Sequence, residues 1–288
     1  MKNEKKALLS VVLLNYNASA DCRTCLKYIK KQDYETLEIV VVDNASEPED
    51  RSALQTLCEE EKVILLLNDK NSGFSAGNNI GLQKAAEHGA EYVLIINPDV
   101  QLRSRNYLSR LVSIMQNDES IAIAAGDMVG LSGDHQNPSR YFSYWEEVLW
   151  PIEKIKRKCV AQKKEACSWQ HSGYCEKLSG GCLLMRMRFL QEIDFLDEGT
   201  FLYLEETILR HQVLQLGLHM YYSSDVEVLH AHEKLTGQVS LQQMKQLWKS
   251  QDYYLEKYKP YKGVKKWLLV LSWQLFRSML TWKQNRSK

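Results

Sequence analysis

The chain has 288 residues, of which 44% are hydrophobic and 25% are charged. This content supplies a substantial hydrophobic core and excludes a disordered chain, a collagen-like repeat and a small disulfide scaffold. Lys and Arg number 37 against 36 Asp and Glu, yet nine of the basic residues and none of the acidic ones lie from residue 257 onward. The sequence therefore predicts an acidic globular body and a basic C-terminal tail that faces an anionic partner.

Seven cysteines at irregular positions do not form the pattern of an oxidised framework, so we expect a reducing compartment. Cys22 and Cys25 form a C-x-x-C pair, which is found in redox-active motifs and in zinc sites, but no second pair follows. We favour the simpler interpretation, in which they are two small side chains on an early helix.

Three lysines among the first six residues precede the apolar run 7–14, in the outline of a signal peptide. Asn15, Tyr16 and Asn17 interrupt that run, and no small-x-small cleavage site follows at a suitable distance, so we interpret it as a buried first strand. No stretch approaches the roughly 20 uninterrupted apolar residues that a spanning helix needs. We therefore expect no integral membrane protein.

Apolar runs and helical patterns alternate through the first 125 residues. We expect strands over 8–14, 38–42, 63–67, 92–96 and 121–125, and helices over 18–32, 47–61, 75–88 and 104–117. Because the strands are continuously apolar rather than alternating, the pattern predicts an α/β fold with a mostly parallel sheet covered by helices on both faces.

The pattern becomes irregular beyond residue 130. The segment 130–175 is rich in aromatic and then in basic residues, and is either a lid or acceptor surface or an ordinary surface excursion. Regular elements return after it. They are a strand over 176–187 around Gly180 and Gly181, a helix that opens at Glu205 and Glu206, and a last strand over 219–230.

Polar clusters follow four of the expected strands. They are Asn15-Tyr16-Asn17, Asp43-Asn44, the segment 68–75 and Asn97-Pro98-Asp99. The carboxyl ends of parallel strands meet at one edge of a sheet, where ligands of such folds bind, so the clusters would share one crevice. Each cluster alone is compatible with an ordinary turn. Together they predict a nucleotide and metal site.

Seven sequence blocks, taken in their order and spacing, resemble the family 2 glycosyltransferases over roughly residues 8–240. The blocks are SVVLLNYN (10–17), EIVVVDNAS (38–46), NSGFSAGNNIGL (71–82), YVLIINPDV (92–100), SGGCLLMR (179–186), FLYLEE (201–206) and HAH (230–232). Within that family they are most similar to rhamnosyltransferase-like enzymes of bacterial surface polysaccharide assembly. The resemblance implies a GT-A fold over 1–240, with a donor half of about 1–126 and an acceptor half of about 127–240.

The resemblance also implies a nucleotide-sugar donor, linked to UDP or dTDP, and a divalent metal, Mn²⁺ or Mg²⁺. Asp99 and His230 would hold the metal, and His232 is a weaker second match to the family's histidine. Asn97 stands where the family usually has the first Asp of an Asp-x-Asp motif. The implied donor-contacting residues are Asn15, Tyr16, Asn17, Asp43, Asn71, Gly73, Asn78, Asn97 and Asp99.

By the same resemblance the catalytic residue is Glu206, which would take the proton of the acceptor hydroxyl in a single displacement that inverts the anomeric configuration. The family commonly has Glu-Asp here and another Asp two positions later, where this chain has Glu205-Glu206 and Ile208. Glu205, Gly180 and Gly181 would lie on the acceptor side. The alternatives are that both glutamates are first-turn charges of a helix and that the glycines mark a bulge in an edge strand.

The segment 241–288 is expected to be a helical, basic appendage. Its apolar stretch 267–282 contains three tryptophans and is flanked by lysines, which is typical of a helix that lies on an anionic membrane. A helix packed against the body or against a second copy is equally compatible with the sequence. We expect a cytoplasmic protein, peripheral at the inner face of the plasma membrane, that acts on a glycan or polyprenyl-linked acceptor and binds no nucleic acid.

Two rival functions are compatible with parts of the sequence. A non-catalytic, membrane-bound scaffold that has kept the fold is motivated by Asn97 and Ile208, which stand in place of acids. A sugar nucleotidyltransferase on a similar sheet needs a Gly-rich, basic phosphate loop after the first strand, and NYNASADC (15–22) is not such a loop. The favoured hypothesis is an enzyme that transfers rhamnose or another hexose to a cell-surface glycan.

Overall fold

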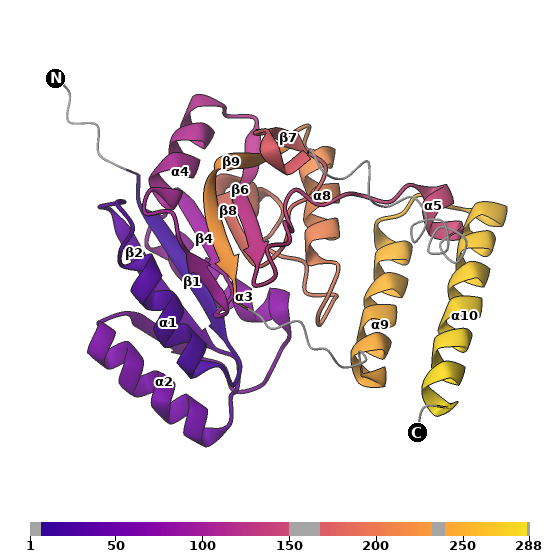
Figure 1. Cartoon of the computed structure of the whole chain (residues 1–288), viewed down its shortest axis with the longest axis horizontal. Helices are drawn as coiled ribbons and strands as arrows, with labels where there is room; N and C mark the ends of the chain where they lie inside the picture. The colour runs from indigo at the N-terminus through magenta and orange to yellow at the C-terminus, as the bar shows by residue number, and fades with distance from the viewer. Residues whose placement is uncertain (1–6, 150–167, 232–239, 287–288) are drawn as a thin grey trace.

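The computed structural model describes residues 7–149, 168–231 and 240–286. Figure 1 shows a sheet with helices packed around it and, beside this body, two C-terminal helices that lie side by side with opposite chain directions. The expected α/β class is thereby confirmed. The expected helical appendage corresponds to α9 (Leu241–Lys257) and α10 (Gly263–Arg286).

Nine strands of the described residues form one sheet in the order β3-β2-β1-β4-β8-β6-β9-β5, with β7 paired to β9. The strands are β1 Leu9–Asn15, β2 Leu37–Asp43, β3 Ile64–Leu67, β4 Tyr92–Ile96, β5 Val100–Leu102, β6 Ile121–Gly130, β7 Gly173–Cys175, β8 Cys182–Arg186 and β9 His219–His230.

The sheet is parallel in its first half and mixed in its second. β3, β2, β1 and β4 run parallel, as expected. β8 runs antiparallel to β4 and β6, and β5 and β7 run antiparallel to β9, while β6 and β9 are parallel. The expectation of a mostly parallel sheet is therefore corrected for the second half. The sequence of β8 does not reveal its direction, because a strand buried on both faces is continuously apolar either way.

Helices cover both faces of this sheet. They are α1 Ser19–Ile29, α2 Pro48–Glu61, α3 Phe74–Glu87, α4 Tyr107–Asn117, α7 Met187–Glu192 and α8 Glu205–Gln215. The other described helices, α5 Tyr144–Val148, α9 and α10, lie beside this body (Figure 1). Because side chains alternate along a strand, β1 serves two cores. Val11 and Leu13 cluster with α1, α2 and α4, and Val12 clusters with α3, α7 and α8.

The packing confirms the expectation for Cys22 and Cys25 and shows a similar role for one glycine. Cys22 and Cys25 are buried on α1 in the first core, and burial raises the pKa of both thiols. Gly81 lies on α3 against the sheet, where an added Cβ would come within 2.5 Å of Val12 Cγ1. These residues serve packing rather than chemistry.

Some boundaries differ from the expected ones. Gly180 and Gly181 form a turn rather than part of a strand, because β8 begins only at Cys182. The strands β5 and β7 have three residues each, which is too short for a recognisable sequence pattern. Within the segment 130–175 the structure has α5, a 3₁₀ turn at Ser168–Gln170 and β7, while residues 150–167 lie outside the described residues.

The two C-terminal helices have different neighbours. α9 packs on the start of α8, where Ile208 lies in one cluster with Tyr254 and Tyr258. α10 contacts α5, and its Arg277 Nη2 donates to Asp252 Oδ1 of α9 at 2.8 Å. None of the described helices, α10 included, is long and apolar enough to cross a membrane. α9 thus packs against α8 on the other side of the expected domain boundary near residue 240. That boundary stays a prediction.

Candidate active site

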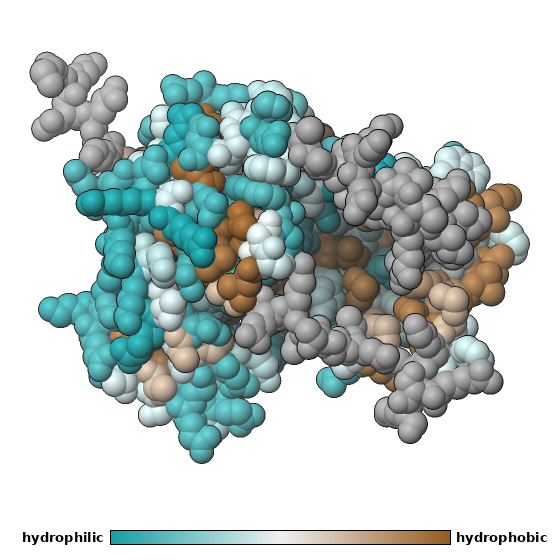
Figure 2. Space-filling view, viewed as in Figure 1, coloured by the Kyte–Doolittle hydropathy of each residue, from teal (hydrophilic) through white to brown (hydrophobic). Residues whose placement is uncertain are grey.

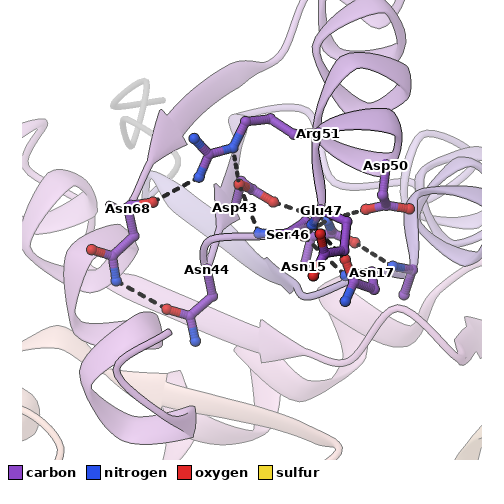
Figure 3. Close-up of polar contacts among 10 residues, drawn as sticks. Asn15, Asn17, Asp43, Asn44, Ser46, Glu47, Asp50, Arg51 and Asn68 are labelled. Atoms are coloured by element: carbon purple, nitrogen blue, oxygen red, sulfur yellow. Dashed lines mark hydrogen bonds and ion pairs between the residues drawn. The ribbon is translucent and has the colours of Figure 1, made fainter. Parts of the chain in front are cut away.

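The ends of β1 and β2 carry a buried polar cluster, which Figure 3 shows. Asn15 lies directly opposite Asp43 in the parallel register. Asp43 is fully buried; its Oδ1 accepts from Asn15 Nδ2 at 3.2 Å and its Oδ2 accepts from Arg51 Nε at 2.8 Å. Asn15 Nδ2 also lies 2.9 Å from Ser46 Oγ and from Asp50 Oδ2. The carboxylate of Asp43 thus organises the loops around it.

Arg51 was not anticipated from the sequence. Its Nη2 donates to the carbonyl of Asn68 at 2.8 Å, so one guanidinium joins the ends of β2 and β3 (Figure 3). A signal was present, since a cation in the first turn of a helix opposes the helix dipole and calls for a specific partner. Asp50 beside it caps α1 by accepting from Ser19 N at 2.9 Å. Burial raises the pKa of Asp50, but hydrogen bonds from Ser19 and Asn15 outweigh it and lower the pKa overall.

Tyr16 and Asn17 lie at the exposed rim of this cluster. The Tyr16 side chain is 51% exposed, so its ring is available to a ligand. Asn17 has a φ of 55° and accepts from Glu47 N through its Oδ1 at 2.8 Å, which fixes the loop after β1. The structure therefore brings together Asn15, Tyr16, Asn17 and Asp43 as expected.

Gly73 and Asn78 make contacts within the protein that the sequence interpretation did not anticipate, and their contact with a donor stays a prediction. Gly73 has a φ of +92°, and an added Cβ would lie 2.4 Å from the carbonyl oxygen of Phe201. The close approach that this glycine permits is thus to the Phe201 backbone, not to open space for a donor. Asn78 is 1% exposed and donates to Phe74 O inside α3 at 2.9 Å. Asn71 Oδ1 accepts from Gly73 N at 3.0 Å and stabilises the turn.

A second cluster forms around the end of β4. Asp99 and His230 meet because β5 pairs with β9, and Ala231 N donates to Asp99 O at 2.7 Å. His230 Nε2 lies 3.3 Å from Asp99 Oδ2. The expected carboxylate and imidazole thus lie side by side, and the carboxylate is a ligand type that suits Mn²⁺ and Mg²⁺. His232 lies outside the described residues.

Asp99 and His230 are the two candidate metal ligands at this point among the described residues. No group of three or more His, Cys, Asp and Glu side chains suited to a metal ion occurs in the described part of the chain. A cation held by Asp99 and His230 would take its other ligands from a bound diphosphate and water, as is usual where Mg²⁺ accompanies phosphates.

The turn before β8 connects this cluster to the acidic pair. Asn97 N donates to Gly181 O at 2.9 Å, and Gly180 N lies 3.4 Å from Glu206 Oε1. An added Cβ at Gly180 would come within 3.1 Å of Glu206 Cγ, so a side chain there would displace the carboxylate. The main chain of this turn thus brings together Asn97 and the Glu206 side chain, which contact Gly181 and Gly180 respectively.

The two glutamates have different surroundings. Glu205 is 8% exposed, whereas Glu206 is only partly buried and contacts the Gly180 turn. Burial first, and then the charge of Glu206, raises the pKa of Glu205 to about 7. The preceding Tyr203 and Leu204 have φ of 74° and 73°, a costly conformation for such residues that tends to mark functional sites. Glu206 is therefore the carboxylate with access to a substrate.

Replacing Glu205 by Gln is expected to stabilise the protein increasingly as pH rises from 5 to 8. The folded state raises the pKa of Glu205 from 4.5 to about 7. Within this window the folded state binds more protons than the unfolded state, so the free energy of unfolding falls as pH rises. The gain of the variant at pH 8 is about 3 kcal/mol, from roughly 1.4 kcal/mol per pKa unit.

Urea unfolding of the wild type and Glu205→Gln at pH 5 and pH 8 measures this gain. Glu192→Gln, at an exposed position on α7, is the matched control and should show a difference that does not change with pH. A pH-independent difference for Glu205→Gln as well would contradict the buried, proton-binding state of Glu205.

The helix α9 holds the loop that leads to these glutamates, which sequence reasoning missed. Asp197 accepts from Tyr253 Oη at 2.7 Å and from Lys257 Nζ at 2.8 Å, and it also contacts Tyr258 Oη. Ser250 Oγ donates to Leu202 O at 2.7 Å. Ile208, at the family's second acidic position, instead packs against Tyr254 and Tyr258. No local sequence pattern indicates contacts that span 50 or so residues.

Comparisons with known proteins identify the family of this chain. The family described as "Glycosyl transferase family 2" matches residues 10–178. The low-salt glycan biosynthesis hexosyltransferase Agl10 of Haloferax volcanii is 22% identical over 223 residues, 77% of this chain and 66% of the relative. The dTDP-rhamnosyl transferase RfbF of Shigella flexneri is 23% identical over 222 residues, 76% of this chain and 68% of the relative. The chain thus spans about two thirds of the length of these relatives.

The fold is shared with solved glycosyltransferases. The crystal structure of GalNAc-T7 with UDP, GalNAc and Mn²⁺ superposes with a TM-score of 0.63 at 17% identity, covering 89% of this chain and 49% of that one. This likeness confirms the GT-A fold that the sequence blocks implied. Since the family match extends over more than half of the chain, the chain belongs to glycosyl transferase family 2.

Proposed function

We propose that this chain transfers a hexose, rhamnose or a related sugar, from a UDP- or dTDP-linked donor to a hydroxyl group of a glycan, with inversion at the anomeric carbon. The turn at Gly180 and Gly181 carries the proposal. It joins the two halves of the site, since Gly181 O accepts from Asn97 N and Gly180 N approaches Glu206 Oε1. The strand end suited to the donor diphosphate and the carboxylate suited to the acceptor proton thus belong to one unit.

In this mechanism Glu206 accepts the proton of the acceptor hydroxyl as the hydroxyl oxygen attacks the anomeric carbon. The new glycosidic bond forms as the bond from that carbon to the donor phosphate breaks, and the nucleoside diphosphate leaves with the electron pair. A divalent metal held by Asp99 and His230 would neutralise the charge that develops on the diphosphate. The exposed ring of Tyr16 is available to the base of the donor, over loops fixed by Asp43.

The choice of sugar and acceptor follows the activities of the relatives. RfbF is a dTDP-rhamnosyl transferase and Agl10 is a hexosyltransferase of glycan biosynthesis. These activities support a nucleotide-activated hexose and a glycan acceptor. We extend the proposal to a cell-surface or polyprenyl-linked glycan, assembled at the inner face of the plasma membrane by a peripheral protein.

The surface of α10 supports this location. Its exposed apolar residues recur every three or four positions, which places them on one face of the helix. They are Val264, Trp267, Leu271, Leu275, Met279 and Trp282. Figure 2 shows apolar side chains gathered at the edge of the molecule over α10. The chain from residue 257 onward is exclusively basic among its charged residues, so an anionic bilayer matches both its apolar face and its charge.

The double variant Leu271→Glu/Leu275→Glu is therefore expected to lose binding to phosphatidylglycerol vesicles. Two carboxylates in the centre of the apolar face would have to enter the interface and be repelled by the lipid charge. Cosedimentation with phosphatidylglycerol and phosphatidylcholine vesicles measures binding. Gln242→Glu/Lys249→Gln changes the net charge equally on exposed positions of α9 and should retain binding. Equal loss of vesicle binding in both double variants would contradict the proposed location. A wild type that forms a dimer and does not bind vesicles would contradict it as well.

A thermal-shift panel of UDP, dTDP, GDP and CDP sugars, each with Mn²⁺ and with EDTA, tests the donor site. A ligand of the native state raises the apparent melting temperature with the logarithm of its concentration over its Kd. We expect a Mn²⁺-dependent shift with UDP- or dTDP-sugars. No shift with any nucleotide in the presence of Mn²⁺ would overturn the proposed donor chemistry.

A further inference from the structure

Gln136 lies in the second coordination layer of the candidate metal site. Its Oε1 lies 2.9 Å from His230 Nδ1, on the side of the ring away from Asp99. Its main chain is anchored to β6, since Gln136 N donates to Met128 O at 2.8 Å. The side chain therefore reaches His230 from a fixed point on the neighbouring strand.

The orientation of the Gln136 amide follows from a third residue. Its Nε2 lies 3.5 Å from Asp134 Oδ2, and a carboxylate accepts from the amino end of an amide. The oxygen end of Gln136 consequently faces His230. Gly130 makes room for this arrangement, because an added Cβ there would lie 2.6 Å from Asp134 Oδ1 and 3.0 Å from Gln136 Nε2.

This orientation determines which nitrogen of His230 carries a proton. An amide oxygen only accepts, so Nδ1 of His230 must donate to Gln136. In the neutral ring the lone pair is then on Nε2, the atom that lies 3.3 Å from Asp99 Oδ2. Adjacent ligands of an octahedral ion with bonds of about 2.1 Å are about 3 Å apart, so this separation suits two ligands of one cation.

We propose that Gln136 is a positioning residue, which holds His230 in the Nδ1–H tautomer and thereby presents Nε2 with Asp99 to the divalent metal of the donor complex. The inference rests on the proposed function, because that function supplies the metal. It goes beyond that function in assigning a role to the loop after β6. Outer-layer partners of metal-binding histidines typically change metal affinity by about 10–100-fold when removed.

Three variants test this assignment. Gln136→Leu removes the acceptor for Nδ1, Gln136→Glu retains an acceptor oxygen, and Ser132→Ala removes a contact to Asp134 in the same loop without touching His230. Titration of Mn²⁺ by electron paramagnetic resonance, with UDP or dTDP present, gives the metal affinity. We expect about 10–100-fold weaker Mn²⁺ binding in Gln136→Leu and affinity within about threefold of the wild type in the other two.

The tautomer itself is visible in long-range ¹H–¹⁵N spectra. The wild type should show His230 protonated at Nδ1, and Gln136→Leu should shift the ring toward the Nε2–H form. Wild-type Mn²⁺ affinity or an unchanged tautomer in Gln136→Leu would overturn the inference, as would equal losses in Gln136→Leu and Gln136→Glu. A wild type that binds nucleotide without any Mn²⁺ dependence would overturn the proposed metal instead, so the two failures are distinguishable.

Discussion

Glu206→Gln is expected to reduce kcat by roughly 10²–10⁴-fold, the range that general-base catalysis contributes. The amide retains the size of the side chain and its proximity to Gly180 N, but it does not accept the proton of the attacking hydroxyl. Donor binding should be unchanged, because the donor-side residues Asn15, Asp43 and Asp99 are untouched. Initial rates of sugar transfer and the thermal shift with donor and Mn²⁺ give the two quantities.

The same experiment separates the enzyme from its rivals. A wild type that is inert with all suitable donors and acceptors, including donor hydrolysis, would favour the scaffold that has kept the fold. Pyrophosphate release from a nucleoside triphosphate would favour the nucleotidyltransferase. A Glu206→Gln variant with the wild-type kcat would leave the fold and the family intact but remove Glu206 as the base.

Asp197→Ala is expected to lower the free energy of unfolding by about 2–4 kcal/mol, because it leaves the hydroxyl groups of the buried Tyr258 and the half-buried Tyr253 without their acceptor. The Asp197 carboxylate is 6% exposed and binds Tyr253 Oη, Lys257 Nζ and Tyr258 Oη. Burial acts to raise the pKa of Asp197, but hydrogen bonds from Lys257 and the two tyrosines lower it overall. This contribution to stability is therefore present above pH 3.8 and is lost as pH falls through the lower folded-state pKa.

Activity should fall together with stability in this variant, since α9 would release the loop that leads to Glu205 and Glu206. Urea unfolding followed by tryptophan fluorescence, and kcat at a temperature where the variant is folded, measure the two effects. Asp225→Ala is the matched control, because Asp225 pairs with Arg110 at the surface with 47% of its side chain exposed. Exposed pairs contribute about 0–1 kcal/mol, so equal losses in both variants would contradict the role of Asp197.

The sequence was most informative where function depends on neighbouring elements. Asn15 and Asp43 end consecutive parallel strands, so their juxtaposition follows from the strand pattern alone. Gly73 shows the limit of such reasoning, because the absence of a side chain there allows close contact with the backbone of Phe201, a residue far along the chain. Asp197 and α9 show the same limit, since a contact between a loop and a distant helix leaves no periodic signal.

The direction of β8 and the position of Gly180 and Gly181 were beyond the sequence for a different reason. Apolar residues specify burial but not strand direction. The turn starts at Gly180, two residues before β8 begins, and no residue type distinguishes a glycine in a strand bulge from one in a turn. The resemblance to a family supplied what local patterns did not, namely the expectation that these glycines and Glu205 lie on the acceptor side.

The packing of Ile208 on Tyr254 and Tyr258 has a consequence for protein engineering. A chimera that exchanges sugar specificity between relatives could be cut near residue 240, the expected end of the GT-A domain. Here such a cut between α8 and α9 would leave an isoleucine, and the Asp197 carboxylate nearby, without the tyrosines that cover them. A functional graft would have to transfer both helices together, and an Asp placed at position 208 would need a new surface on α9 to receive it.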